Sequence, residues 1–401
     1  MPEQITGQAY LGLLDGYLRR LRALYQHPNR VLFYDDVIVV YLIAFFNPVL
    51  RSLRCIEDAS QLPGINQHLS VDAVCKSTLS DANALFDPSH LLGLLADLRA
   101  HLPNLGQMDR TLDHLLKQIR IFDGSFFRAA ADVAWALQSN NQHTKAKGKG
   151  GSAYVRLNCE FCLASGTPAG VSVNGDDGVG EGAAALPFVK EDFIYLFDRG
   201  VVSFPYLRQI HDTGSQFLCC LASSVNFTAT ADRPLSEADR QAGVLSDRVG
   251  FLSGSDCRAP LDFAVREVVV CYIDRCGVSK TLRLLTDLLD LPACVIAELY
   301  RYRWQIELFF RWLKVHASFR HLSSHSRNGV TPGFYIAIIA ALLLSLHTQR
   351  PLSKYGYNLL SMVAAGLGDV THMLPILEKR ERERERERQR QAARRAAKKP
   401  A

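Results

Sequence analysis

The pattern of apolar and polar residues changes character about a quarter of the way along the chain. Up to residue 115, residues that can cap a helix precede apolar residues at helical spacing, as in Ser70–Val74 and Asp87–Leu95. From residue 118 onward, short apolar runs bounded by turn residues favour β-strands instead. We therefore predict an α-helical N-terminal domain over residues 1–115, followed by a mixed α/β region.

Two of the predicted strands end in an acidic residue. The run Gln118–Phe122 leads into Asp123, the run Asp192–Phe197 leads into Asp198, and a glycine follows within two residues of each aspartate. Each aspartate is therefore expected at a strand end, beside a turn. Further strands are expected over residues 154–163, 170–173, 216–222, 265–273 and 280–288, and helices over 130–138, 181–186, 206–212, 292–314 and 332–347.

These elements divide the rest of the chain into three regions. An α/β core is expected from residues 116–223 and 291–350, and a β-rich insertion over residues 224–290 interrupts it. Residues 351–401 form a C-terminal region with a charged tail. The composition, 48% hydrophobic and 21% charged residues, is that of an ordinary globular protein.

No membrane span or export signal is expected. The longest apolar runs, Val37–Phe46 and Phe334–Leu346, are shorter than the roughly 20 residues that a membrane helix needs, which favours buried core elements. The chain does not open on a charged segment followed by an apolar one, as a secretory signal would. We therefore expect the protein in the cytoplasm.

The net charge of +6 lies in the C-terminal tail, because residues 378–401 contain 11 Lys and Arg but only 5 Glu. The remainder of the chain is neutral, so charge alone does not identify a nucleic-acid-binding protein. The tail could bind phosphates, or it could be a solvated helix or a disordered end.

The segment Tyr300–Lys314 has the most informative polar spacing. If it is one helix, Tyr300, Arg303, Glu307 and Lys314 project within about 60° of one another, at about 100° per residue. A carboxylate on this face can bind a divalent metal, and the two basic groups can bind phosphate. Taken alone, the segment could equally be a salt-bridged surface helix in which Arg303 pairs with Glu307.

Asp123, Asp198 and Glu307 together favour a metal site. Carboxylates at the ends of neighbouring strands can converge at one sheet edge, and a helix packed nearby would add the glutamate. Three oxygen ligands suit Mg²⁺, and two such ions roughly 4 Å apart can promote phosphoryl transfer. Each aspartate by itself could also be an ordinary turn residue.

The same residues resemble a known family. The spacing Tyr-x2-Arg-x3-Glu-x6-Lys in residues 300–314 is similar to the signature of the insertion-sequence-four family of bacterial transposases. Residues 121–125 resemble the first catalytic aspartate motif of that family, and residues 196–200 resemble the second. The resemblance spans roughly residues 35–350 and includes the flanking residues 46–54 and 287–293.

The resemblance implies an RNase H-like catalytic core interrupted by the β-rich insertion. Asp123, Asp198 and Glu307 would be the catalytic residues and would hold two Mg²⁺ or Mn²⁺ ions. The N-terminal helical domain would bind the DNA ends, and a homodimer would pair two ends. The enzyme would work in the bacterial cytoplasm, at the nucleoid.

The implied substrate is double-stranded DNA, both the terminal inverted repeats and the target. Arg303 and Lys314 would bind phosphates at the transposon end, with Tyr300 supporting them. The family implies cut-and-paste transposition, in which a freed 3′-OH forms a hairpin and later attacks the target. Positioning and charge neutralisation would supply most of the catalysis.

One feature departs from the family pattern. Some relatives place a Trp in the insertion to stack on a flipped base, whereas the three Trp of this chain lie outside residues 224–290. Phe227, Phe251 or Phe263 could replace it, although ordinary packing is the simpler role for each. Two other functions stay open: an RNase H-like nuclease that never joins DNA, and a non-catalytic DNA-binding protein derived from a transposase.

Overall fold

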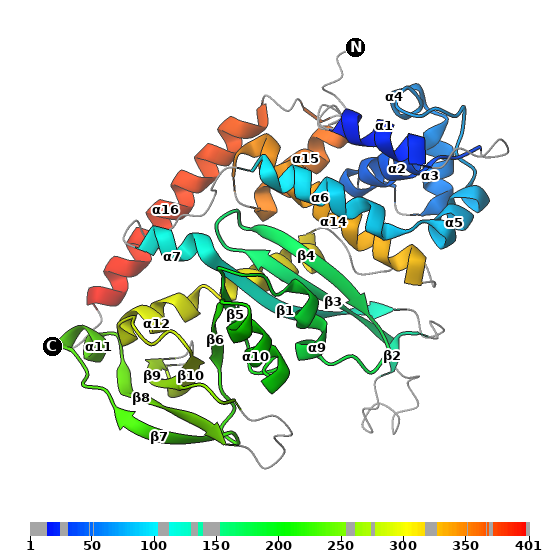
Figure 1. The fold of residues 1–401 in the computed structure, drawn as a ribbon. Helices are drawn as coiled ribbons and strands as arrows, with labels where there is room; N and C mark the ends of the chain where they lie inside the picture. Colours follow the sequence, from blue (N-terminus) through cyan, green and yellow to red (C-terminus); the bar gives the residue numbers. More distant parts are fainter. Residues whose placement is uncertain are drawn as a thin grey trace, which may run out of the picture. The chain divides into compact units, whose positions relative to one another are not determined.

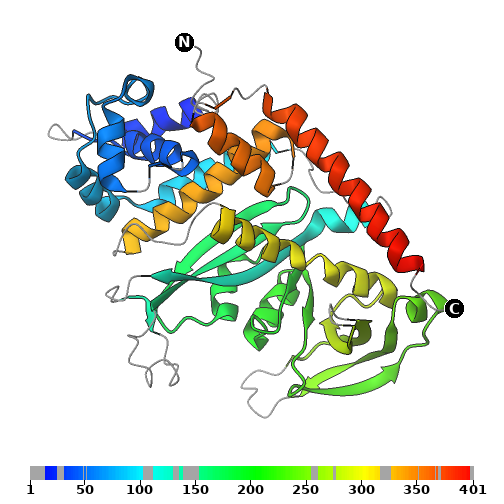
Figure 2. The ribbon, with the colours of Figure 1, turned by 180° about the vertical axis from the view of Figure 1, so that it is seen from behind.

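The structure is a computed structural model that describes residues 14–24, 31–47, 49–50, 52–102, 112–129, 135–138, 153–253, 261–273, 277–316, 327–350, 352–365, 367–368 and 372–397. The chain divides into two compact units (Figures 1 and 2). One unit comprises Met1–His101, Val315–Phe319 and Ser326–Ala401, and the other comprises Leu102–Lys314 and Arg320–His325.

The first unit is helical. Its α-helices are α1 (Asp15–Leu24), α2 (Tyr34–Phe46), α3 (Leu53–Ser60), α4 (Pro63–Asn66), α5 (Lys76–Leu85), α6 (Leu91–Ala100), α14 (Arg327–Thr348), α15 (Lys354–Ala364) and α16 (Met373–Ala397). Helix α14 packs against α2, α5 and α6. Residues 332–347 were predicted within the α/β core; in the structure they lie in α14 of the helical unit, where the helix is apolar all round and the N-terminal helices cover it.

Helix α14 contains the second long apolar run. Over Gly329–Thr348 it is long and apolar enough to cross a membrane, yet 83% of its most apolar window is buried inside the unit. Every residue from Phe334 to Leu344 is buried. This burial confirms the predicted core helix, although the helix is longer than the apolar run suggested.

The two predicted caps in this unit behave differently. The side chain of Asp87 accepts a hydrogen bond from the Ser89 backbone N–H at 2.9 Å and so begins the short turn before α6, as predicted. Ser70 begins no helix, because its backbone N–H and its hydroxyl both donate to the buried carboxylate of Asp36. The next helix starts only at Lys76.

The second unit is built on one mixed sheet. Its strand order is β2 (Leu137–Gln138), β3 (Ala153–Cys162), β1 (Ile119–Ala129), β5 (Ile194–Phe197), β6 (Gln216–Cys220), β10 (Ser279–Thr286), β9 (Val265–Ile273), β8 (Val244–Ser253) and β7 (Asn226–Asp232), with β4 (Thr167–Asn174) paired to β3. Strands β4, β3 and β1 are antiparallel neighbours, whereas β5 and β6 run parallel to β1. This order agrees with the predicted RNase H-like core.

Strands β7 to β10 fall within the predicted insertion. They extend the core sheet instead of forming a separate one, because β10 pairs with β6, with Leu284 opposite Cys220. The predicted strands 265–273 and 280–288 correspond to β9 and β10. Strand β7 was not predicted, since nearly all of its residues are exposed and it has no apolar alternation.

The structure corrects two predicted helices. Residues 292–314 are not one helix: α12 (Ala293–Arg301) ends in a turn at Tyr302 and Arg303, and α13 (Trp304–Arg311) continues into a π-helical turn (Trp312–His316). In the described part of residues 130–138, β2 replaces the predicted helix because it pairs with β3; residues 130–134 lie outside the described residues.

Helices cover both faces of the core sheet. On one face, α9 (Glu181–Ala185) and α10 (Phe204–Asp212) pack over a core that includes Phe122, Phe197 and Tyr206 (Figure 1). On the opposite face lies α13, where the Phe309 ring is 5.9 Å from the Phe161 ring of β3 (Figure 2). Side chains alternate along a strand, so Phe122 on the α10 face places Asp123 on the α13 face.

Candidate active site

Asp123 and Asp198 lie where the parallel pairing of β1 and β5 stops. The last paired residues of these strands are Phe122 and Phe197, and each aspartate follows directly. Strand β1 does not end there as predicted, because its antiparallel pairing with β3 continues to Ala129. Each carboxylate accepts a hydrogen bond from the next backbone N–H, at 2.8 Å for Asp123 and 2.7 Å for Asp198.

The four polar residues predicted to share one helix face come from four local settings. Tyr300 is buried near the end of α12, Arg303 lies in the turn, Glu307 lies in α13, and Lys314 lies in the π-helical turn. The Arg303 guanidinium pairs with the Glu307 carboxylate at 2.6 Å and lies 5.9 Å from the Tyr300 ring. Because a turn separates α12 from α13, the four side chains do not share one helix face as predicted. Tyr300, Arg303 and Glu307 nevertheless lie close together.

Lys314 reaches the strand that carries the first aspartate. Its ammonium group donates a hydrogen bond to the Ser125 hydroxyl at 2.7 Å and lies 5.0 Å from the Phe127 ring. Burial lowers the pKa of Lys314, and the Asp123 carboxylate opposes that shift. The lysine and the aspartate are therefore close enough to interact electrostatically.

The electrostatics of Asp123 show which groups surround it. The pKa of Asp123 is raised to about 7, chiefly by burial, and the charges of Glu181 and Asp198 act in the same direction. The Gly124 N–H and the Arg303 guanidinium act in the opposite direction. The structure thus gathers both aspartates with Arg303 and Lys314, and burial raises the pKa of the neighbouring Tyr300 as well.

The chemistry of these donors fits a divalent cation. Carboxylate oxygens are the ligands that Mg²⁺ prefers, and a cation would relieve the repulsion between Asp123 and its acidic neighbours. Among the described residues, however, no three acidic, histidine or cysteine side chains lie close enough to enclose an ion. Glu307 is instead held by Arg303, so the predicted convergence of three carboxylates is not present in this structure.

Glu181 is an acidic residue at this site that the sequence did not identify. It is the first residue of α9 and contributes to the electrostatics of Asp123. The sequence predicted only a helical turn here, and no motif marked its glutamate. Its position depends on how α9 packs against β1 and β3.

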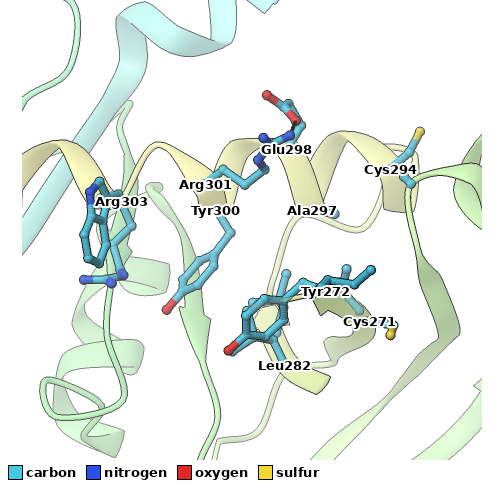
Figure 3. A pocket seen from close by; sticks show the side chains of 14 residues that line it. Cys271, Tyr272, Leu282, Cys294, Ala297, Glu298, Tyr300, Arg301 and Arg303 are labelled. Carbon is cyan, nitrogen blue, oxygen red and sulfur yellow. Dashed lines mark hydrogen bonds and ion pairs between the residues drawn. The ribbon is translucent and has the colours of Figure 1, made fainter. Parts of the chain in front are cut away.

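A cavity of about 540 Å³ lies next to the helix residues, between α12 and the strands β9 and β10. Figure 3 shows Tyr300 projecting from α12 on the side where Tyr272 and Leu282 of the strands lie. Arg303 and Trp304 also line the cavity. Tyr272 and Trp304 are 40% and 39% exposed, so two aromatic side chains at this cavity are accessible to a ligand.

The three phenylalanines considered for base stacking have other surroundings. Phe227 and Phe263 pack against the core cluster, and the Phe263 ring stacks on His211 at 3.7 Å. Phe251 is the most exposed of the three, at 41%. The sequence analysis set Trp304 aside because it lies outside residues 224–290, and it did not consider Tyr272; only the fold brings strand β9 beside α12, with Trp304 at the same cavity.

Comparison with protein families shows one extensive match. The family described as "Transposase DDE domain" matches residues 114–343. This range contains all six residues that were singled out from the sequence, and it covers more than half of the chain.

Three curated proteins resemble parts of the chain. "Putative transposase y4zB" of Sinorhizobium fredii is 29% identical over 158 residues, which is 39% of this chain and 43% of that protein. "Probable transposase for insertion sequence element IS5377" of Geobacillus stearothermophilus is 32% identical over 103 residues, 26% of each chain. "Putative transposase for insertion sequence element IS4SA" of a Synechocystis strain is 43% identical over 51 residues, 13% of this chain and 15% of that protein. The matched stretches cover less than half of each relative.

Among solved structures, the cryo-EM structure of the piggyBac transposase synaptic complex with hairpin DNA covers 93% of this chain and 82% of its own. Its TM-score is 0.43 and its sequence identity 12%. Similarity at this level does not establish a shared fold or function.

Proposed function

The chain belongs to the transposase DDE domain family, and from this we propose that it catalyses cut-and-paste transposition of an insertion sequence. It would cleave DNA strands at terminal inverted repeats and transfer the freed 3′-OH ends into target DNA. The observation that carries the proposal is the placement of Asp123 and Asp198 directly after the last paired residues of the parallel strands β1 and β5, with Arg303 and Lys314 beside them.

We assign the catalytic role to Asp123, Asp198 and Glu307, which would hold two Mg²⁺ or Mn²⁺ ions. When bound, such ions activate the attacking oxygen and stabilise the leaving oxygen of phosphoryl transfer. The protein's own part is to orient the DNA strand and to neutralise its charge, which supplies most of the catalysis in reactions of this type.

The ion pair between Arg303 and Glu307 suggests how DNA completes the site. A guanidinium binds phosphate as well as carboxylate, with two parallel hydrogen bonds in either case. If a DNA phosphate replaces the Glu307 carboxylate on Arg303, the glutamate is released for metal binding. Lys314 would bind a second phosphate, and Tyr300 would support Arg303 through its ring.

A hairpin route for excision is also part of the proposal. A tight hairpin leaves a base unpaired, and an unpaired base stacks favourably on aromatic side chains. The cavity beside Tyr300 presents Tyr272 and Trp304 for this purpose. The helical N-terminal unit would bind the terminal repeats, and a homodimer would pair two ends.

The decisive experiment is a cleavage and joining assay. Purified full-length protein is incubated with Mg²⁺, target DNA and a fragment carrying the inverted repeats that flank its gene. We expect nicked, excised and joined products from the wild type, and none from Asp123→Ala. Asp262→Ala is the matched control, because this aspartate is exposed and pairs with Arg208 at the surface.

The same assay separates the other candidate functions. Nicks without joined products would indicate a nuclease. Salt-dependent DNA binding with no nicks, unchanged by Glu307→Gln, would indicate a DNA-binding protein without catalysis. Equal activity of Asp123→Ala and wild type would contradict the assigned site.

A further inference from the structure

Helix α12 begins without a capping side chain of its own. The first N–H groups of an α-helix have no partner within the helix, and a polar side chain at the preceding residue usually binds one of them. Pro292 occupies that position in α12, and its side chain makes no such hydrogen bond. Its carbonyl accepts hydrogen bonds from the Val295 and Ile296 N–H groups, at 3.1 and 3.2 Å. The Cys294 N–H is left to an acceptor from elsewhere in the fold.

Asp239, in the β-rich insertion, supplies this acceptor. It belongs to the short helix α11 (Glu237–Gln241), which packs against α12 (Figure 1). Its Oδ1 atom accepts a hydrogen bond from the Cys294 N–H at 2.8 Å, and the two residues are 55 positions apart in the sequence. The cap of α12 is therefore a tertiary contact that the fold of the insertion creates.

The two oxygens of the Asp239 carboxylate serve different helices. Oδ2 accepts hydrogen bonds from the Ser236 N–H at 2.9 Å and from the Ser236 hydroxyl at 2.7 Å, which completes the capping box of α11. Oδ1 faces Cys294 of α12. Although burial opposes ionisation, the hydrogen bonds from Ser236 and Cys294 lower the pKa of Asp239 to about 2. The carboxylate is therefore charged at neutral pH, and a negative charge stabilises the beginning of a helix.

The insertion also holds the loop that leads into α12. The Arg266 guanidinium donates to the carbonyls of Leu288 and Leu291, and the Arg233 guanidinium donates to the carbonyl of Leu289. Donors of the insertion thus bind the carbonyls of the loop, while an acceptor of the insertion binds an N–H of the helix. The start of α12 can neither slide nor turn without breaking several of these hydrogen bonds.

The other end of α12 leads to the residues assigned to DNA binding. Tyr300 lies in its last turn, where its hydroxyl hydrogen-bonds to the Cys220 thiol of β6, and Arg303 follows in the turn after the helix. The helix has nine residues and is about 13 Å long. Because so short a helix moves as one body, a shift at Cys294 reaches Arg303. A misplacement of about 1 Å is enough to cost about 100-fold in rate.

Building on the proposed function, we propose that Asp239 positions Arg303 for the DNA phosphate by capping α12 from the insertion. In that function Arg303 exchanges the Glu307 carboxylate for a phosphate, so the guanidinium must keep its place while its partner changes. A helix held at its start by Asp239, and near its end through Tyr300, provides that place. Asp239 is a positioning residue, because it acts on the phosphate through α12.

The test is DNA binding by Asp239→Asn, measured by filter binding without divalent metal. The purified full chain is mixed with a fragment carrying the inverted repeats that flank its gene. An asparagine amide has a single acceptor oxygen, which preserves the capping box of α11 when it faces the two donors of Ser236. Its NH₂ group then faces the Cys294 N–H, donor against donor. The variant therefore keeps the cap of α11 and removes that of α12.

We expect Arg303→Ala to weaken DNA binding about 10-fold or more and to reduce the slope of log affinity against log salt by about 0.9, the contribution of one phosphate contact. Asp239→Asn should have both effects. The two substitutions together should weaken binding no further than either alone, because both remove the same contact. Glu237→Gln is the matched control: this exposed glutamate of α11 loses the same charge, and the variant should bind DNA as the wild type does.

The outcomes separate the inference from the function on which it rests. If Arg303→Ala binds DNA with the affinity and slope of the wild type, the phosphate contact is refuted, and the inference with it. If Asp239→Asn alone behaves as the wild type, or if the two fold-changes multiply in the combined variant, the positioning role is refuted and the contact of Arg303 stands. A loss of stability with an unchanged slope would also refute the role.

A second variant decides should Asp239→Asn fail to fold. Cys294→Pro removes the N–H that Asp239 binds, in the first turn of α12, where proline is tolerated. It leaves Asp239 and the capping box of α11 in place. We expect the same reduced slope as in Arg303→Ala, and a wild-type slope would refute the positioning role.

Discussion

Asp123 combines a partly buried carboxyl with two acidic neighbours. Its pKa of about 7 means that, without a cation, it is only partly charged at neutral pH. A divalent ion would have to displace the remaining proton, so metal binding and proton release are coupled at this residue. The cost of holding these groups together is therefore offset only when the cation is present, which is typical of a functional site.

The accessible aromatic residues at the cavity lead to a prediction for hairpin formation. Trp304→Ala should reduce the hairpin product by about 5- to 150-fold, because removal of one base-stacking interaction costs about 1–3 kcal/mol. The first nick should be nearly unaffected, since it needs no unpaired base. Products are quantified on denaturing gels from a single-turnover reaction.

Phe251→Ala is the control for that experiment. Phe251 is as exposed as Trp304 but does not line the cavity. A decrease of hairpin in the control as large as in Trp304→Ala would show that the cavity has no special role. Equal slowing of nicking and hairpin formation in Trp304→Ala would likewise contradict base stacking.

Helix α12 depends on a buried ion pair in the inserted strands. Arg266 is almost fully buried, and its guanidinium makes two hydrogen bonds of 2.7 Å to the Asp247 carboxylate. It also donates to the carbonyls of Leu288 and Leu291, in the loop just before α12. The insertion thereby fixes the start of the helix that carries Tyr300.

Breaking this pair should destabilise the second unit. Arg266→Leu leaves the buried Asp247 carboxylate with the more distant guanidinium of Arg233, at 3.6 Å, in place of its two close hydrogen bonds, and we expect the free energy of unfolding to fall by about 3 kcal/mol. Urea denaturation followed by circular dichroism measures the change. Arg208→Leu, which removes an exposed pair with Asp262, should cost no more than about 1 kcal/mol. Similar losses of unfolding free energy in Arg266→Leu and Arg208→Leu would show that the buried ion pair contributes no more to stability than the exposed one.

On the scale of the whole molecule, net charge is concentrated in one helix. The tail forms most of α16, whose only buried residues are Met373 and Leu377 among those with described side chains. The described side chains of residues 378–387, 389 and 390 are all exposed, so their charges face solvent. Arg350 pairs with Glu378 at 3.5 Å and ties the beginning of this charged stretch to the helical unit. Residues 378–397 are therefore helical, and a binding experiment decides whether this charged stretch binds DNA.

Removal of residues 378–401 should weaken non-specific DNA binding. The tail carries the whole excess of +6, and each phosphate that it no longer neutralises should reduce the slope of log affinity against log salt by about 0.9. Filter binding between about 50 and 200 mM salt, the range over which such binding weakens steeply, measures the slope. An unchanged slope in a truncated protein with normal helicity would identify the tail as a solvated helix only.

The sequence by itself determined the class of the fold and most elements near the site. Short apolar runs located β3, β5, β6, β9 and β10, because local pattern and final burial agree in these strands. Spacing and motif identified Asp123, Asp198 and the polar residues around Glu307 without any tertiary information. Strands and motifs of this kind can be predicted from sequence because they depend on residues that are neighbours along the chain.

Only the tertiary structure decided how those residues meet. The break at Tyr302 and Arg303 cannot be read from a helical pattern that continues through it, and the pairing of Glu307 with Arg303 follows from that geometry. The same holds for Glu181, which carries no motif and reaches the site through the packing of α9. Contacts between residues distant in sequence depend on how whole helices and strands pack, and this packing cannot be predicted from a local sequence pattern.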